Sequence, residues 1–354
     1  MPRLSCCWNV PLASSLKRRV DGLVRVEGSY GEGGGQILRS CAALSAVTGR
    51  PVEIVNVRGK RTRPGFQPQH LRAVLATAEL CGARLKGAEV GSTYLLFEPT
   101  HEPKPGDYRF DIGTAGATTL VVQAVLVPLL LTRQESRIVV TGGTHNDHAP
   151  CAEYLEFVLL PALERAGVAY RFEYPAAGYY PRGGGRIELQ IQAPTGLRGL
   201  VFAPSVRPRP CAVSLSSSLP PHVAQRGADA LRHVDPNPEI REKPSPGAGA
   251  AAFTYLHGLA GFTGLGAKGK PMEAVARDAA EPMEHFLEQD AAIDEHLADQ
   301  LVLPMSFACG PTRYNTWQAT EHLRTVAWVA AQFLDVRIRI DEDETGRAFV
   351  EIDP

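Results

Sequence analysis

A helix followed by two strands occurs three times in this chain, and this repeat is the feature that most constrains its fold. In each copy a helix with apolar residues at helical spacing leads into a strand, a turn and a second strand. In the first copy Leu71, Val74, Leu75, Ala78 and Leu80 lie on one stripe of the helix. The copies occupy residues 69–99, 152–193 and 321–354. Because such a helix must bury its apolar face on a sheet, the repeat predicts packed modules in an α/β (α+β) protein.

Residues 196–285 have a different composition, with proline and glycine concentrated in their middle. Short strands and helices flank this stretch, which predicts a small inserted α/β domain. The large domain would then consist of residues 21–195 and 286–354. Residues 1–20 contain basic residues but no continuous apolar segment, so we expect a disordered extension rather than a signal peptide.

Charge and cysteine content narrow the classes of function. The 37 basic and 38 acidic residues give a net charge of -1, so contact with a nucleic acid must be local, as in a pocket for one end. Seven cysteines without CxxC spacing argue against a disulfide framework and a zinc site, and favour the cytoplasm. The apolar segment 117–131 is shorter than a membrane span of about 20 residues and contains Gln123 and Pro128. It predicts a buried helix, and no membrane contact is expected.

A glycine-rich turn precedes a helix that starts near Gln36 and ends at Gly49. Such a turn exposes backbone N–H groups that can bind an anion. Glu32 within the turn and Arg39 in the helix favour a site for phosphate and metal together. The sequence is neither a Walker A nor a GxGxxG motif, and a tight structural turn remains the alternative.

A cationic loop follows, with four basic residues within positions 58–63. Arg58 and Arg61 suit bidentate phosphate binding, and Gln69 and His70 come shortly afterwards. The alternative is a solvated surface.

Polar residues also interrupt apolar helices. Gln123 lies in an otherwise apolar helix, so its amide requires a hydrogen-bonding partner, and Asp299 and Gln300 interrupt a second apolar run. These side chains are candidates to contact a nucleotide, or else a buried structural pair.

His322 opens the helix of the last repeat, where the helix dipole favours an uncharged ring. A neutral imidazole is the nucleophilic form of histidine. Other histidines lie in loops or in the insert and are expected to be incidental: His101, His222, His233, His257 and His285.

Seven strings together resemble the RNA 3'-terminal phosphate cyclases. They are GSYGEGGGQILRS, RGKRTRPGFQPQHL, CGA…EVGST, DYRFDIGTAGATTLVVQ, GGTHN…AP, GYYPRGGG and HLADQLVLPM. Their order and spacing match the family from about residue 21 to the C-terminus, although the insert matches only loosely. The resemblance implies βαβαββ modules similar to the C-terminal domain of translation initiation factor 3, plus a small inserted domain. It also implies an ATP-dependent cytoplasmic ligase that converts RNA 3'-phosphate ends into 2',3'-cyclic phosphodiesters through a histidinyl-AMP intermediate, in a family whose members can form homodimers.

The resemblance further implies a role for each matching residue. Three would be catalytic, the first as the adenylated nucleophile: His322, Arg39 and Arg61. Six would contact ATP: Gln123, His296, Leu297, Ala298, Asp299 and Gln300. Three would hold the substrate phosphate: Arg58, Gln69 and His70. Glu32 would bind Mg²⁺ or Mn²⁺.

The sequence departs from the family at two places. Position 296 is His where several relatives have an aromatic phenol side chain, and the residues before His322, NTWQATE, differ from the usual family sequence. Both departures bear on base preference or nucleotide affinity. Three rival functions are a non-catalytic cyclase-like protein of ribosome assembly, a carboxyvinyl-transferase of the shikimate type, and a module that only binds phosphate ends. His322 and the arginine loop argue against the first, and the HLADQLVLPM string argues against the second.

Overall fold

The computed structural model describes residues 22–193, 195–205 and 207–354. The expected disordered extension, residues 1–20, lies outside this part of the chain. Within it the strands form four sheets, each of mixed or antiparallel pairing, with helices packed on them. The chain is therefore a mixed α/β protein, as the repeat predicts.

The first module contains the glycine turn and the arginine loop. Its elements are β1 (Val24–Glu27), α2 (Gly35–Thr48), β2 (Val52–Val55), α3 (Pro68–Cys81), β3 (Arg84–Lys86) and β4 (Leu95–Glu98). The sheet order is β1-β2-β4-β3, with β1 and β2 parallel and the remaining pairs antiparallel. Gly49 ends α2 in the left-handed conformation, as the sequence predicts.

The second module repeats this order of elements and pairing. It consists of β5 (Asp107–Asp111), α4 (Thr118–Leu131), β6 (Ser136–Gly142), a helix in three parts, β7 (Tyr170–Ala176) and β8 (Gly185–Ile191). The helix is α5 (Ala152–Tyr154), a π-helical turn η1 (Leu155–Leu159) and α6 (Leu160–Arg165). The sheet order β5-β6-β8-β7 matches the first module strand for strand. Helix α4 is almost entirely buried, which confirms the interpretation of the apolar segment. None of the described helices combines the length and apolar character that a membrane span requires.

The third module is interrupted by the insert. Its sheet has the order β13-β15-β14, formed by β13 (Thr312–Thr316), β14 (Arg337–Glu342) and β15 (Ala348–Asp353), with α9 (Glu295–Met305) and α10 (Glu321–Phe333). Arg198 and Val201 form parallel bridges with Cys309 and Arg313 beside β13. These bridges place a short first strand on the third sheet before the chain enters the insert.

The insert has a sheet and a core of its own. Its elements are β9 (Cys211–Ser217), α7 (His222–Leu231), β10 (Glu239–Glu242), β11 (Gly249–Leu256), β12 (Ala260–Leu265) and α8 (Met272–Glu288). The order is β10-β9-β11-β12, and α7 and α8 cover one face. The other face shares the main core with the second module, where Phe253 and Leu215 join Tyr154 and Val158.

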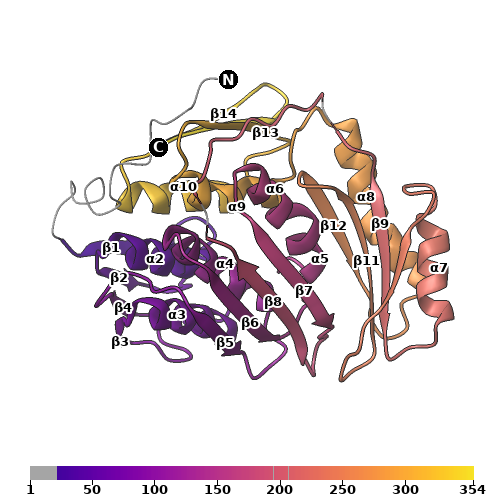
Figure 1. The fold of residues 1–354 in the computed structure, drawn as a ribbon, viewed down its shortest axis with the longest axis horizontal. Coiled ribbons are helices and arrows are strands. Elements are labelled where there is room, and N and C mark those ends of the chain that lie inside the picture. Colours follow the sequence, from indigo (N-terminus) through magenta and orange to yellow (C-terminus); the bar gives the residue numbers. More distant parts are fainter. Residues whose placement is uncertain (1–21, 194, 206) are drawn as a thin grey trace.

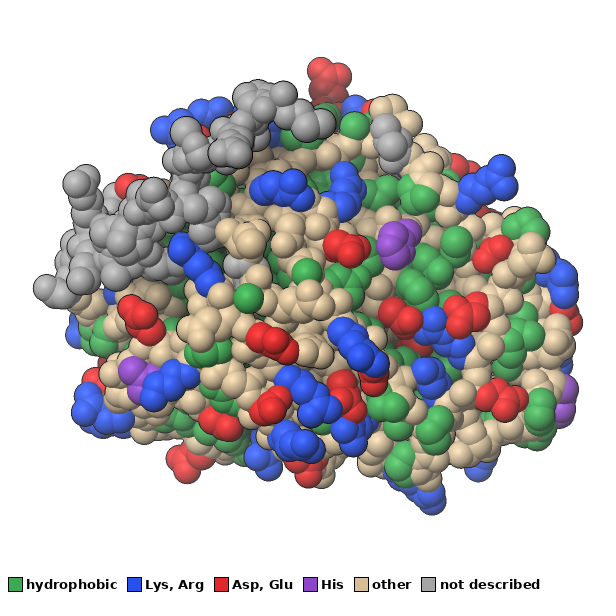
Figure 2. All heavy atoms as spheres, in the orientation of Figure 1, with side chains coloured by type: hydrophobic (Ala, Val, Ile, Leu, Met, Phe, Trp, Pro, Cys, Tyr) green, Lys and Arg blue, Asp and Glu red, His purple; other side chains and the backbone are tan. Residues whose placement is uncertain are grey.

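Helices of the three modules pack together in the middle of the molecule, as Figure 1 shows, with the sheets outside. Helix α10 packs on α2 and α9, and α4 packs on α2 and α3. Figure 2 shows basic and acidic side chains interspersed over the visible face, as the balanced charge predicts. Because α2, α4, α9 and α10 converge, their polar residues meet at one place.

Candidate active site

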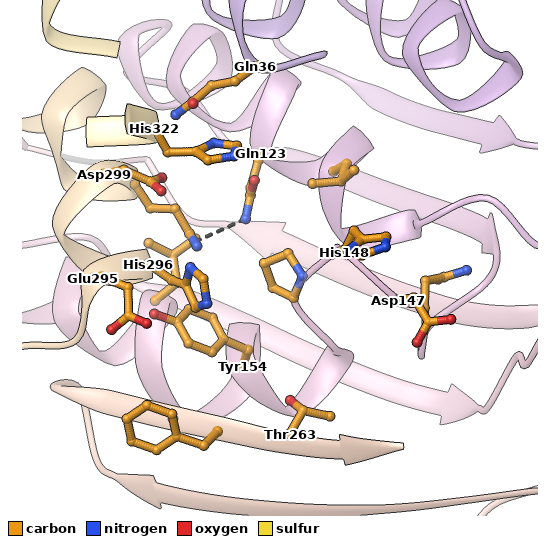
Figure 3. Close-up of a pocket in the computed structure, with 18 of the residues that line it drawn as sticks. Gln36, Gln123, Asp147, His148, Tyr154, Thr263, Glu295, His296, Asp299 and His322 are labelled. Carbon is orange, nitrogen blue, oxygen red and sulfur yellow. Dashed lines mark hydrogen bonds between the residues drawn. The ribbon is translucent and has the colours of Figure 1, made fainter. Parts of the chain in front are cut away.

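A cavity of about 1040 Å³ opens where the three modules meet the insert. Its volume is in the upper range of small-molecule pockets. Helices α2, α4, α9 and α10 contribute walls, and β12, α8 and the loop of residues 146–150 close the remainder. Figure 3 shows His322, Gln123, Asp299 and His296 around this space. Six predicted site residues line the cavity: Arg39, Gln123, His296, Asp299, Gln300 and His322.

His322 lies in the first turn of α10, whose N-cap is Thr320. The Thr320 hydroxyl accepts a hydrogen bond from the Leu323 N–H at 3.1 Å, so the helix begins at a defined point. The imidazole is 45% exposed and its Nε2 is 3.3 Å from Glu32 Oε2. Burial lowers the pKa of His322, and the charges of Arg39 and Arg61 add to this against the opposing effect of Glu32. The ring is therefore uncharged at neutral pH, as the helix position predicts.

The glycine turn brings Glu32 to this histidine and packs against the arginine loop. Arg61 donates a hydrogen bond of 2.7 Å to Glu32 Oε2, which therefore contacts both His322 and Arg61. A Cβ at Gly35 would lie 2.3 Å from the His70 ring, so a side chain there would force the first turns of α2 and α3 apart. Gly31 and Gly33 have φ values of 55° and 59°, which favour glycine.

Charged groups inside the cavity shift one another's pKa. Burial lowers the pKa of Arg39 to about 10, opposed by Asp299. Burial also raises the pKa of Asp299 to about 7, although the positive charges of His296 and Arg39 oppose the rise. For His296 burial disfavours the charged form, but Asp294, Glu295 and Asp299 outweigh it and raise the pKa. Perturbed groups of this kind in a cleft mark a functional site.

The residues expected to hold the substrate phosphate lie behind the glycine turn and do not line the cavity. His70 is buried at the start of α3, and its Nδ1 accepts a 3.4 Å hydrogen bond from the Gln67 N–H. Burial, together with nearby arginines, lowers the pKa of His70 to about 3. Arg58 donates to the carbonyl oxygens of Arg63 and Gly65 at 2.9 and 3.2 Å, so it shapes its own loop. Gln69 packs beside Gly116, where an added Cβ would be 3.4 Å away.

Helix α9 lines the cavity with polar residues and with Leu303 and Pro304, while other apolar residues of the helix pack in the core. Leu297 and Ala298 are completely buried, so any contact with a ligand would not come from their side chains. Gln123 donates to Gln300 Oε1 at 3.0 Å across the cavity, which provides the partner that the sequence requires (Figure 3). The N-cap residue Asp294 fixes the helix start.

Asp294 is a completely buried residue next to the cavity-lining residues Glu295 and His296, and it was not predicted from the sequence. Its carboxylate accepts hydrogen bonds from the Leu297 N–H at 2.6 Å, the Gly261 N–H at 2.8 Å and the Tyr154 hydroxyl at 2.7 Å. These bonds join α9 to the insert and to the second module. Burial raises the pKa of Asp294 to about 6, against the opposing charge of His296.

Two further parts of the cavity wall were not predicted. His285 of α8, which was expected to be incidental, lines the cavity and packs edge-on against Trp317. The loop from Asn146 to Pro150 also lines it, and His148 and Asp147 are visible in Figure 3. The string GGTHN…AP contains this loop, and is the one signal in the sequence for it.

An uncharged histidine beside a glutamate and arginines, at a large cavity that also contains polar and ionisable side chains, is an arrangement suited to enzymes that transfer phosphoryl or nucleotidyl groups. The family model described as RNA 3'-terminal phosphate cyclase matches residues 30–340. This chain belongs to that family.

Relatives in distant organisms align over nearly the whole chain. The RNA 3'-terminal phosphate cyclase of Pyrobaculum neutrophilum is 43% identical in an alignment 330 residues long. The alignment covers 90% of this chain and 95% of the relative. The RNA 3'-terminal phosphate cyclase of Methanopyrus kandleri is 39% identical in an alignment 353 residues long. That alignment covers 94% of this chain and 99% of the relative. Among solved structures, an enolpyruvyl transferase, NikO from Streptomyces tendae, covers 94% of this chain and 66% of its own, with 10% identity and a TM-score of 0.27. This score is too low to support an argument.

Proposed function

We propose that this chain is an ATP-dependent enzyme that converts an RNA 3'-terminal phosphate into a 2',3'-cyclic phosphodiester. The observation that carries the proposal is the position of His322. Its uncharged ring faces a nucleotide-sized cavity and lies 3.3 Å from Glu32, in a chain of the cyclase family.

The first step would join His322 to AMP. A ring nitrogen attacks the α-phosphorus of ATP, a nitrogen–phosphorus bond forms, and the bond to pyrophosphate breaks. Arg39 inside the cavity and Arg61 beside Glu32 are near enough to stabilise the negative charge that develops on phosphate oxygens. Positioning and charge neutralisation are the main requirements of such a transfer.

Two further displacements would complete the reaction. An oxygen of the RNA 3'-phosphate attacks the phosphorus on His322, so AMP moves to the RNA and the histidine is regenerated. The neighbouring 2'-hydroxyl then attacks the RNA phosphorus, the ring closes, and AMP leaves. Arg58 and Arg61, with Gln69 and His70 close by in the same segment, would receive the RNA phosphate beside the glycine turn, where Arg61 contacts Glu32.

The nucleotide would bind between α4 and α9. The Gln123–Gln300 pair offers amide donors and acceptors, while His296 and Asp299 add ionisable groups on the same wall. His296 packs edge-on against Tyr154, with ring centroids 6.3 Å apart. An aromatic pair beside polar groups suits a purine base.

Glu32 is the proposed ligand for Mg²⁺ or Mn²⁺. These ions are commonly bound through one or two carboxylates together with phosphate oxygens, so one protein carboxylate beside the nucleotide site fits them. When bound, the ion would withdraw charge from the phosphates and assist the departure of pyrophosphate. The Glu32 carboxylate contacts Arg61 and His322, so an ion bound to Glu32 would lie close to both of these side chains.

The finer features of the fold belong to the same proposal. We infer that the three modules correspond to the βαβαββ unit of the initiation factor 3 C-terminal domain, because the first two share one strand order. We also propose that the insert begins after Val201, because this residue pairs with the third sheet, and ends with α8. A homodimer and a cytoplasmic location remain predictions, and sedimentation of the purified chain tests the first.

Covalent labelling tests the function. The protein is incubated with ATP labelled in the α-phosphate, and the adduct is mapped by mass spectrometry. We expect an acid-labile AMP on the peptide that contains His322, also in a His257→Ala control, whose substituted residue is exposed in a turn of the insert. An unlabelled protein would instead favour the non-catalytic relative, and label on another residue would reject His322. Label without turnover of RNA would leave the third alternative, a module that binds phosphate ends and has residual activity only.

A further inference from the structure

A second group of reactive side chains lies outside the cavity, buried between the second module and the insert. His145, Cys151 and Glu153 each direct one ligand atom to the same point, with these atoms within 4.8 Å of one another. All three residues are buried, and the side chains of His145 and Glu153 are each only 1% exposed. The proposed reaction uses none of them.

The carboxylate of Glu153 pairs with His145 but has no well-aligned hydrogen bond among the described residues. His145 Nε2 lies 2.8 Å from its Oε2, yet neither oxygen has an aligned hydrogen bond within the described part of the chain. A buried carboxylate that is not hydrogen-bonded costs several kcal/mol. A cation placed among the three side chains would give the carboxylate a further partner.

Water cannot supply the missing partner. The three side chains line a small cavity together with Phe253 and Thr263, and it has no room for a water molecule. A bare ion requires less space than a water molecule, because its ligands contact it directly at about 2.0 to 2.3 Å.

The other ring nitrogen of His145 has the support that metal-binding histidines require. Thr144 Oγ1 lies 3.0 Å from His145 Nδ1, and the same hydroxyl oxygen accepts a hydrogen bond from the Gly178 N–H at 2.9 Å. When Nδ1–H donates to Thr144, Nε2 keeps its lone pair for a cation, which is how neighbouring groups orient the histidine ligands of metals.

We infer that His145, Cys151 and Glu153 form a structural site for a zinc-class divalent cation. Nitrogen, sulfur and carboxylate oxygen together favour Zn²⁺ or Co²⁺ over Mg²⁺. Binding displaces the thiol proton of Cys151 to solvent, so one thiolate and one carboxylate balance the two positive charges. The site is then neutral in its apolar surroundings. Thr263 Oγ1, 3.3 Å from Cys151 Sγ, faces the remaining position.

The location gives this cation a role. The loop from Asn146 to Pro150 forms part of the cavity wall, and His145 and Cys151 stand at its two ends. Thr263 lies on β12 of the insert and lines both the large cavity and the small one. One ion would therefore hold the loop closed at its base and join it to the insert.

Metal content of the untagged protein tests the inference. After exposure to Zn²⁺ and removal of free metal, we expect one equivalent of zinc per chain by mass spectrometry. Cys151→Ala and Glu153→Gln should retain less than a tenth of it. The matched control is Cys41→Ala, another completely buried thiol, in the core of the first module, which should bind as the unmodified chain does.

Cobalt separates this site from any metal at Glu32. Co²⁺ bound by the unmodified protein should give a thiolate-to-metal charge-transfer band, which persists in Glu32→Gln and disappears in Cys151→Ala. If the alanine variant does not fold, Cys151→Ser provides the same comparison with less change of volume. Zinc content in the unmodified chain no higher than in the Cys151 variants would overturn the inference, whatever the outcome of the ATP-labelling experiment.

Discussion

Two histidine–glutamate pairs in this protein differ mainly in their exposure to solvent. His322 and Glu32 are 3.3 Å apart, with side chains 45% and 41% exposed. His145 and Glu153 are 2.8 Å apart, and both side chains are 1% exposed. Solvent weakens the first pair, which contributes about 0–1 kcal/mol and leaves its imidazole free to react. Because the second pair is buried, removal of either side chain leaves the other without a partner, at a cost in stability unless an ion takes its place.

The largest expected effect is the loss of ring closure when His322 of the exposed pair is replaced. His322→Ala should reduce ring closure at least about 10³-fold, because removal of a covalent nucleophile eliminates the main reaction route. Thermal unfolding should change little, since the ring is half-exposed. Single-turnover assays with a 3'-phosphorylated RNA measure the loss. Ring closure at the rate of a His257→Ala control would show that another group is the nucleophile.

Loss of the buried carboxylate should act on stability instead. Glu153→Ala is expected to lower the free energy of unfolding by about 3–5 kcal/mol, because it leaves His145 buried without a partner. Glu32→Ala should lower it by less than about 1 kcal/mol. Urea denaturation of the two variants gives both values. Similar losses in both would mean that burial does not separate the pairs.

Substitution of Arg61 tests the exposed pair alone, because this arginine contacts Glu32. Arg61→Ala should slow AMP transfer about 10²-fold, the usual effect of removing one group that stabilises a developing anion. Its side chain is 41% exposed, so stability should remain within about 1 kcal/mol. Arg63→Ala, in the same loop and also exposed, is the matched control. Equal rates in the two variants would remove Arg61 from the site.

A last prediction concerns the pH dependence of stability, through two carboxylates, the buried Asp294 at the N-cap of α9 and Asp299 within it. The pKa values of Asp294 and Asp299 are about 6 and 7, against an ordinary 3.8. The folded state therefore binds their protons more tightly than the unfolded chain, and their contribution to stability is lost as pH rises from about 4 to 7. Asp299→Asn should make this decline shallower. Urea midpoints at several pH values measure it, and an unchanged slope would contradict the assignment.

The sequence predicts the features that depend on local pattern. The three helix–strand–strand copies, the start of α2 after the glycine turn and the burial of α4 are all confirmed. His322 also lies beside Glu32, as the sequence-based site requires.

Features made by tertiary packing were not predictable. Asp294 gains its importance from donors on β12 and α5, and His285 reaches the cavity because α8 packs back across the insert. The absence of CxxC spacing argued against a zinc site, whereas the buried donors proposed here follow an H-x5-C-x-E pattern that has no distinctive signature. Only the fold shows that these three side chains converge.

The interruption of the third module has a consequence for biosynthesis. A ribosome produces the bridged segment near Val201 first, then the whole insert, and only afterwards α9 and α10, which supply two walls of the cavity. The cavity is therefore incomplete in a nascent chain until α10 has emerged. A transcript truncated shortly before that helix would yield an inert product, even though most of the protein had already been made.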